Sequence, residues 1–251
     1  MSVPRWLKAI KDALAVPDNK GKVVYQVATV DSQNVPHART QVNRGFIIPK
    51  SSPHLPLLVS SSDVRAPKVV QMLSNSAVEL CWWMEGSQDQ FRLLAKANII
   101  PPPDSRLKTI TSSLQGFSIT ALDEAGEESE DEGDRLGTDG KYDWEKKRRE
   151  VFEGMKPAMR ASWCAPVAPG SPISSYDEPS KWPREVPNLE DLKTDEDRKN
   201  YETALSNFAM VVFEPFKIDW VQLGEQPNRR TEFIRKGSAD VVHWEEQIVA
   251  P

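Results

Sequence analysis

Short strand-like segments joined by turns fill the first hundred residues of this 251-residue chain, and they constrain its fold more than any other feature. The expected strands are residues 22–30, 36–42, 46–48, 55–60, 77–84 and 91–100. Asp31-Ser32-Gln33-Asn34 separates the first pair and Glu85 to Asp89 the last, so each of these pairs predicts a β-hairpin. Many short strands with turns between them are typical of a small β-barrel.

Helices are expected to flank these strands. Residues 4–15 carry apolar side chains at helical spacing behind a first-turn proline, Pro4. Residues 66–73 predict a short helix with Ser62 or Asp63 as its upstream cap. Further helical character occurs at residues 142–155, and strand character resumes at residues 208–213, 218–223, 231–235 and 243–249. The predicted fold class is mainly β with flanking helices, an α+β arrangement.

Two segments are expected to lack regular structure. Residues 122–140 place nine acidic side chains among glycines, and too few apolar groups are present to offset the entropy of ordering. Residues 165–192 predict a Pro-rich loop. With 39% hydrophobic residues the chain can bury a sizeable core. We interpret residues 1–251 as a single domain that carries a disordered acidic insertion and this loop.

Charge and cysteine content narrow the class of protein. The formal net charge is −5 and the isoelectric point about 5.4, so no overall basic field attracts nucleic acid. Cys81 and Cys164 are too far apart to suggest a metal site or a disulfide framework. No apolar run is long enough to span a membrane. We expect a cytoplasmic protein without metal, nucleic-acid or membrane partners, and a nuclear location is left open.

A local set of cations stands out against this acidic background. Arg39, Arg44, Arg65 and Lys68 fall at the ends of strands or in turns, and Ser61 and Ser62 lie between them. Guanidinium groups bind phosphate through two parallel hydrogen bonds, while lysine adds a point charge and serine a small donor. The pattern therefore predicts a ligand that carries phosphate. The alternative is that these cations are ordinary solvated surface charges.

The order of several short motifs resembles the pyridoxamine phosphate oxidase-like family of FMN-binding split barrels. The motifs are Val27-Ala28-Thr29-Val30, Arg39-Thr40-Gln41-Val42-Asn43-Arg44, Ser62-Asp63-Val64-Arg65-Ala66-Pro67-Lys68, Glu79-Leu80-Cys81-Trp82-Trp83, Gln90-Phe91-Arg92-Leu93 and Phe213-Glu214-Pro215. The likeness covers roughly the first hundred residues and returns from residue 208 to the end of the chain. It implies an FMN-binding split β-barrel that forms a homodimer, with the flavin site at the subunit interface.

The resemblance also implies roles for particular residues. Arg39, Arg65 and Lys68 would hold the FMN phosphate, with Ser61 and Ser62 as added donors. Val42 and Asn43 would bring backbone groups toward the isoalloxazine edge. Gln90 would reach the flavin of the neighbouring subunit, and Trp220 with Arg229 or Arg230 would lie over the cofactor. Arg44 is the candidate catalytic residue beside flavin N5 and the substrate; it would stay charged and could steady an anion, but could hardly shuttle protons.

Plainer interpretations exist for several of these residues. Gln90 could bond its own turn, and Trp220 could belong to the core. Trp82 and Trp83 are adjacent on a strand and point to opposite faces, so one is expected in the core and the other at the dimer surface or flavin rim.

The resemblance implies an FMN-dependent oxidoreductase that transfers hydride between a small-molecule substrate and flavin N5. The segment Arg229-Arg230-Thr231-Glu232 lacks the Arg-any-His element with which vitamin B6 oxidases grip their substrate, so this chain departs from that specific activity. Alternatives are reduction of an unsaturated or quinone-like substrate, a non-catalytic flavin-binding or sensor protein, and a dimeric scaffold without flavin.

Overall fold

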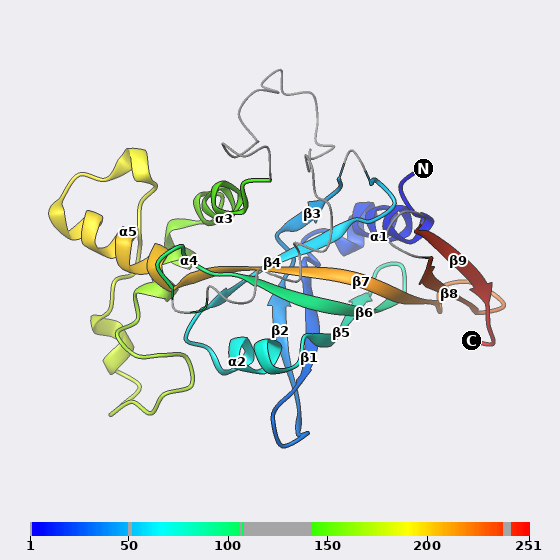
Figure 1. Cartoon of the computed structure of the whole chain (residues 1–251), viewed down its shortest axis with the longest axis horizontal. Coiled ribbons are helices and arrows are strands. Elements are labelled where there is room, and N and C mark those ends of the chain that lie inside the picture. Colours follow the sequence, from blue (N-terminus) through cyan, green and yellow to red (C-terminus); the bar gives the residue numbers. More distant parts are fainter. Residues whose placement is uncertain (1, 50–51, 106, 108–141, 238–241) are drawn as a thin grey trace.

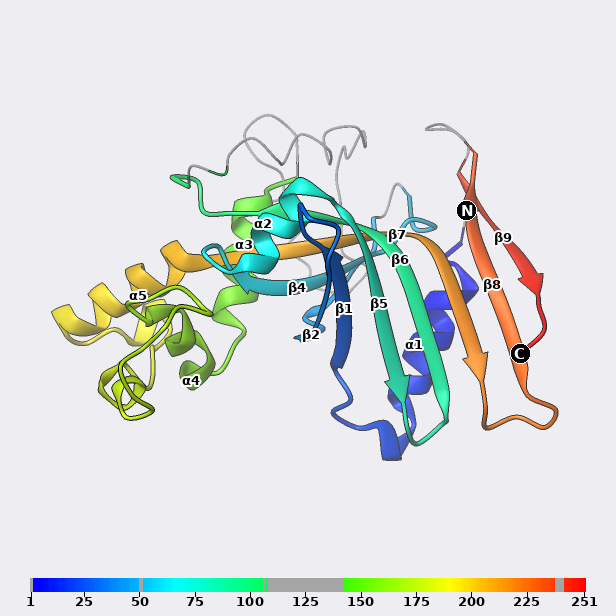
Figure 2. The ribbon, with the colours of Figure 1, turned by 90° about the horizontal axis from the view of Figure 1, so that it is seen from below.

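An antiparallel sheet forms the centre of the protein in a computed structural model that describes residues 2–49, 52–105, 107, 142–237 and 242–251. Within these residues the sheet has nine strands in the order β2-β1-β5-β6-β7-β4-β3, and β8 and β9 continue from β7 (Figures 1 and 2). The strands are β1 (Val24–Val30), β2 (Pro36–Val42), β3 (Gly45–Ile47), β4 (Leu57–Asp63), β5 (Ala77–Met84), β6 (Asp89–Ile100), β7 (Phe208–Gln222), β8 (Arg229–Lys236) and β9 (His243–Ile248). Both predicted hairpins, β1–β2 and β5–β6, are confirmed.

Helices flank the sheet, as the sequence predicts. They are α1 (Arg5–Ala15), α2 (Pro67–Ser74), α3 (Trp144–Glu153), α4 (Pro157–Arg160) and α5 (Asp195–Asn207), with 3-10 turns η1 (Pro17–Asn19), η3 (Ala161–Cys164), η4 (Glu178–Lys181) and η5 (Leu189–Asp191). Helices α3, α4 and α5 gather toward one end of the long strand β7, while β8 and β9 lie at the other end (Figure 1). The mainly β fold with flanking helices is confirmed.

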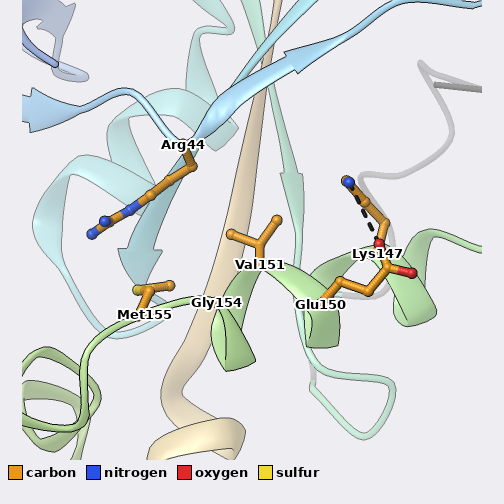
Figure 3. A pocket seen from close by; sticks show the side chains of 6 residues that line it. All are labelled: Arg44, Lys147, Glu150, Val151, Gly154 and Met155. Carbon is orange, nitrogen blue, oxygen red and sulfur yellow. Dashed lines mark hydrogen bonds and ion pairs between the residues drawn. The ribbon is translucent and has the colours of Figure 1, made fainter. Parts of the chain in front are cut away.

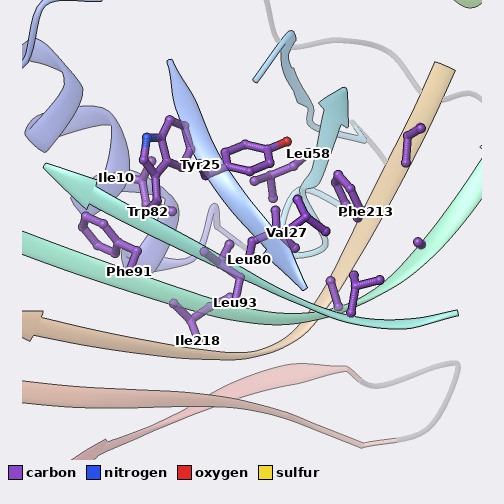
Figure 4. Close-up of a cluster of buried hydrophobic side chains, with 14 of the residues drawn as sticks. Ile10, Tyr25, Val27, Leu58, Leu80, Trp82, Phe91, Leu93, Phe213 and Ile218 are labelled. Atoms are coloured by element: carbon purple, nitrogen blue, oxygen red, sulfur yellow. The ribbon is translucent and has the colours of Figure 1, made fainter. Parts of the chain in front are cut away.

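Strand β7 separates two hydrophobic cores. Its residues Ala209, Val211 and Phe213 face the first core, which contains Trp6 and Tyr25 and is drawn in part in Figure 4. The intervening residues Phe208, Met210 and Val212 face the second core, beneath α3, η3 and α5. Because both faces of this strand are buried, the run Phe-Ala-Met-Val-Val-Phe is apolar throughout instead of alternating with polar residues.

The barrel is split between β2 and β4, which share no ladder of backbone bonds. Side chains bridge this gap: Gln41 Nε2 donates to the Ser61 carbonyl at 3.2 Å, and Ser60 Oγ donates to the Val42 carbonyl at 2.8 Å. The two strands that face one another across the split carry four of the predicted cofactor residues, namely Arg39, Val42, Ser61 and Ser62.

The prediction of two separate strands around Pro215 is wrong. Residues 208–222 form one strand, β7, which pairs with β4 through its first half and with β8 through its second half. Pro215 lies where the register with β6 shifts between Leu94 and Ala95. A proline that lacks a donor is tolerated at such a bulge, so the strand bends there instead of ending.

Two helix features also differ from the sequence interpretation. Helix α5 was not predicted, although its start carries a capping box in which Thr194 and Asp197 bond each other's backbone. Helix α2 forms as predicted but begins after Ala66 and has no side-chain cap. Asp63 instead accepts a hydrogen bond from the Arg65 backbone, so it orders the turn before the helix.

The acidic segment 122–140 lies outside the described residues. The segment 165–192 contains the short turns η4 and η5 and otherwise has no helix or strand. No helix among the described residues is both long and apolar enough to cross a membrane. Trp82 is fully buried in the first core and Trp83 is 39% exposed, so the expected division between these two tryptophans is confirmed as far as burial is concerned.

Candidate functional site

Arg39 lies at the end of the barrel closed by helix α2. Its Nη1 donates to Thr29 Oγ1 at 2.6 Å, and its Nη2 donates to Gln71 Oε1 at 2.8 Å. Thr29 Oγ1 also donates to Gln71 Oε1 at 2.7 Å. These partners are neutral, so they fix the guanidinium in place without cancelling its charge.

Lys68 stands in the first turn of α2 beside Arg39. Burial lowers the pKa of Lys68, and the positive charge of Arg39 lowers it further, while Asp63 opposes the shift. No residue in the described part of the chain accepts a hydrogen bond from its ammonium group. Two neighbouring cations are thus held together at a cost in free energy, which is typical of a site prepared for an anion.

Arg65 is placed differently from Arg39 and Lys68. Its Nε and Nη2 form a two-pronged ion pair with the Asp63 carboxylate at 2.9 and 2.7 Å, and its Nη1 donates to the Ala165 carbonyl at 2.9 Å. Trp163 Nε1 donates to the Ser62 carbonyl at 3.1 Å. The turn before α2 is therefore joined to the segment around η3, and the charge of Arg65 is largely balanced by Asp63.

Ser61, Ser62 and Asn43, which directly follows β2, also form hydrogen bonds within the chain. Ser62 is buried, and its hydroxyl donates to the Asp63 carbonyl at 3.1 Å. Ser61 is half-buried, and its hydroxyl accepts from Arg44 Nε at 3.4 Å. The backbone N–H of Asn43 donates to the Val23 carbonyl, so Asn43 is held against the edge of β1.

Arg44 lines a cavity of about 220 Å³ between the start of β3 and helix α3 (Figure 3). The other lining residues are Lys147, Glu150, Val151, Gly154 and Met155. Arg44 Nη2 donates to the thioether sulfur of Met159 at 2.7 Å. Burial lowers the pKa of Arg44, and within the described residues no carboxylate pairs with its guanidinium.

Gln90 and Arg230 share the outer face of the sheet, away from Arg39. Gln90 stands between Trp83 and Val221 in neighbouring strands, and Val221 pairs with Arg230. Since directly opposed residues share a face, Gln90 and Arg230 flank Val221 on the same side. A single chain does not bring them to the Arg39 and Lys68 pair.

Asp219 holds both Arg92 and Arg230 on this outer face. Arg230 Nε and Nη2 each donate to the Asp219 carboxylate at 2.9 Å, and Arg92 donates to the same carboxylate. The two guanidinium groups hold the pKa of Asp219 below its ordinary value against the opposing effect of burial. Arg229 points elsewhere, is exposed and pairs with Glu225 at 3.4 Å.

Trp220 packs on the core side of the sheet beneath α1. Its ring stacks on Phe91 with centroids 5.6 Å apart, the Arg5 guanidinium lies 5.7 Å from its centroid, and its Nε1 donates to Asp89 at 2.8 Å. These contacts are those of a core-edge tryptophan. In one chain Trp220 is separated from the residues at the split.

Other site chemistries find less support in the described residues. No group of three or more His, Cys, Asp or Glu side chains there is arranged to hold a metal ion. Burial raises the pKa of the Cys164 thiol to about 11, which disfavours a thiolate nucleophile.

Some residues of the site were not identified from the sequence. Gln71, Thr29 and Asp63 orient Arg39 and Arg65, and Val151 and Met155 form a wall of the Arg44 cavity. Asp63 lies inside the motif that carries Arg65, so local spacing could have suggested it. Gln71 and the residues of α3 become neighbours only through tertiary packing.

The chain is similar to one family of known proteins and to several solved structures. Residues 3–101 match the family of the pyridoxamine 5'-phosphate oxidase FMN-binding domain. A pyridoxamine 5'-phosphate oxidase-related FMN-binding protein from Nostoc punctiforme aligns over 100% of both chains with 22% identity and a TM-score of 0.66. PhzG from Burkholderia lata, solved with tetrahydrophenazine-1-carboxylic acid, aligns over 98% of this chain and 89% of its own with 12% identity and a TM-score of 0.52.

No curated protein matches the chain. The family match covers the strands β1 to β6 and helices α1 and α2, which carry the Arg39 and Lys68 pair. The structural likeness extends the same fold over the full chain. Residues 3–101 of this chain therefore resemble the FMN-binding domain of the pyridoxamine 5'-phosphate oxidase family, and the whole chain has the fold of the FMN-binding protein from Nostoc punctiforme that is related to that oxidase.

Proposed function

We propose that this protein binds FMN and acts as an oxidoreductase on a small anionic molecule. The observation that carries the proposal is the pair of neighbouring cations, Arg39 and Lys68, which lack an acidic partner of their own. Asp63 is already bonded to Arg65 in a two-pronged ion pair. Three cations and one carboxylate leave an excess of two positive charges, which matches a phosphate dianion.

The residues along the split fit the rest of such a cofactor. From Arg39 to Val42 the strand β2 advances three residues, or roughly 10 Å at the usual rise of a strand, and Asn43 and Arg44 follow beyond its end. This length separates a phosphate at Arg39 and Lys68 from a ring system near Val42, Asn43 and Arg44. Bound FMN would supply the exchange of hydride at its N5 atom. The protein would supply placement and electrostatics.

Arg44 is proposed to attract and orient the substrate. Its charge is not paired with a carboxylate in the described part of the chain, and it faces a cavity large enough for a small organic molecule. A guanidinium stays protonated at any working pH, so Arg44 would stabilise negative charge and would not transfer a proton.

A non-catalytic flavin-binding role is the rival proposal. Glu150 and Lys147 both line the cavity and form an ion pair. The distance from Lys147 Nζ to Glu150 Oε2 is 3.4 Å. Among the described residues no unpaired general acid or base lines the cavity, and this favours either simple hydride exchange or binding alone.

Spectroscopy and turnover test these two proposals. An absorption spectrum of the purified protein, with mass spectrometry of the molecule released on heating, should identify FMN. An enzyme must then reoxidise its photoreduced flavin faster with a substrate than with buffer. A protein that stays colourless after incubation with FMN would contradict both proposals.

We expect FMN affinity to fall at alkaline pH. The pKa of Lys68 is lowered in the free protein, and a bound phosphate dianion would raise it again. Deprotonation of Lys68 in the free protein removes its attraction for the phosphate, so FMN affinity falls as the pH rises through the free-protein pKa, by up to about tenfold per pH unit. FMN titrations between neutral pH and pH 10 should show this loss, and Lys68→Met should remove it. The same pH dependence in wild type and variant would argue against Lys68 as a ligand.

We also propose a homodimer in which Gln90 and Arg230 of one subunit reach the flavin of the other. Both lie on the outer face beside Trp83, which is 39% exposed. Trp83→Glu would place a charge at the centre of this face, and we expect it to weaken dimerisation and FMN binding together. Sizing by light scattering with parallel FMN titration tests this. A monomeric variant with unchanged FMN affinity would refute the shared site.

A further inference from the structure

The cavity beside Arg44 has features that restrict what it can bind. Its volume is about 220 Å³, and Arg44 and the pair Lys147 and Glu150 lie on different sides of it, with Val151 between them (Figure 3). A cavity of roughly 150 Å³ accepts a benzene ring. The Arg44 cavity therefore has room for one ring with a small polar group attached.

One end of the cavity carries an unbalanced charge. Arg44 is held by the Ser61 hydroxyl at 3.4 Å and the Met159 sulfur at 2.7 Å, both neutral. A thioether is a weak acceptor on a flexible chain, and Met159 is 37% exposed. An incoming carboxylate could replace this sulfur at little cost and form a charge-assisted pair with the guanidinium.

The other lining groups do not add positive charge. Lys147 forms an ion pair with Glu150 at 3.4 Å, and the side chain of Glu150 is 47% exposed. Val151 and Met155 provide apolar surface, and Gly154 contributes a wall without a side chain. The arrangement contrasts with the Arg39 and Lys68 site, where two cations and an ordered turn suit a dianion.

We propose that this cavity binds the substrate as a monoanion, a carboxylate on an apolar ring or short chain, and that it discriminates against phosphate monoesters. One guanidinium can balance a carboxylate. A dianionic phosphate would keep one uncompensated charge among apolar side chains and near the Glu150 carboxylate, which is costly. The inference rests on the proposed function, because it names the substrate class of the same site.

Binding of benzoate and phenyl phosphate tests the inference. Both probes carry one phenyl ring, so they differ mainly in headgroup charge at pH 8. Calorimetry or ligand-observed NMR in the presence of excess FMN, which would occupy the phosphate site at Arg39 and Lys68, should show that benzoate binds at least about tenfold more tightly than phenyl phosphate. Equal affinities, tighter binding of the phosphate ester, or binding of neither probe would overturn the inference.

Two variants assign the binding to this cavity. Arg44→Met should weaken benzoate binding by at least about tenfold, because it removes a charge-assisted hydrogen bond. Val151→Phe should weaken it by filling the space. Arg198→Met removes an equal charge from an exposed position on α5 and should leave the affinity unchanged. Unchanged benzoate affinity in both cavity variants would overturn the assignment.

FMN titration of the same samples separates the two proposals. If FMN binds but benzoate does not, the inference fails and the proposed function stands. If benzoate binds at Arg44 but FMN does not bind, the cavity is confirmed as a carboxylate site and the proposed function fails. Circular dichroism checks that each cavity variant keeps its secondary structure. A variant that loses secondary structure is left out of the comparison, and the other cavity variant then decides whether benzoate binds in this cavity.

Discussion

Replacing Arg39 and Lys68 together with methionine is expected to weaken FMN binding by about 3–6 kcal/mol, or roughly 10²- to 10⁴-fold. Each cation would contribute a charge-assisted hydrogen bond to the phosphate, worth about 1.5–3 kcal/mol. Because both act on one phosphate, we expect the two losses to add incompletely. Quenching of flavin fluorescence during titration of the variant measures the effect.

A control with the same change in charge is available. Lys20 and Arg198 are exposed, and Lys20→Met with Arg198→Met should leave FMN affinity within about a factor of two, since exposed charges contribute little. If the control weakens FMN binding as much as the site variant, general electrostatic attraction explains the loss of affinity. The assignment of Arg39 and Lys68 as phosphate ligands would then be wrong.

The same charges should lower the stability of the FMN-free protein. Lys68→Met removes a half-buried ammonium group that repels Arg39, so we expect it to raise the free energy of unfolding by about 0.5–2 kcal/mol while FMN affinity falls. A lysine with a purely structural role would show loss of stability instead.

Arg148→Met should lower the free energy of unfolding by about 3–5 kcal/mol. Arg148 on α3 is 1% exposed, and its Nη1 donates to the carbonyls of Leu205 and Phe208 at 3.0 and 2.8 Å. Its Nε and Nη2 donate to Glu145 at 2.7 and 2.8 Å. Methionine fills much of the same space but removes the donor to two buried carbonyls, while Glu145 keeps only its bond from Arg149. For a chain of this size, the midpoint of thermal unfolding should fall by roughly 10 °C.

Arg149 is the matched control for this variant. It is the next residue on α3 and pairs with the same Glu145 at 2.7 Å, but its side chain is 49% exposed. Arg149→Met should therefore cost less than about 1 kcal/mol. Equal losses in the two variants would show that the ion pair with Glu145, and not the buried carbonyl contacts, stabilises the helix.

Helix α3 also connects this stability to the substrate cavity. Arg148 ties α3 to the end of α5 and the start of β7, and the next turn of α3 carries Val151 into the cavity wall, which Met155 continues just after the helix. The position of the cavity wall thus depends on an arginine that the ligand would not touch.

The sequence by itself determined the strand hairpins, the division between Trp82 and Trp83, and the motifs that match the family domain. Strands and turns depend on residues only a few positions apart in the sequence, so the alternation of apolar side chains and the turn residues predict them without a structure. The bend of β7 at Pro215 was misread for the same reason, because a proline ends an isolated strand but is accommodated once β6 supplies a bulge.

The tertiary structure alone decided which side chains surround Arg39. The pairing of Arg65 with Asp63 is local, but Arg39 is held by the neutral side chains of Thr29 and Gln71 from β1 and α2, which lie far from it in the sequence. The wall of the Arg44 cavity comes from α3, about a hundred residues later in the chain. Charge compensation and cavity shape depend on distances between segments remote in sequence, and only packing of the folded chain sets those distances.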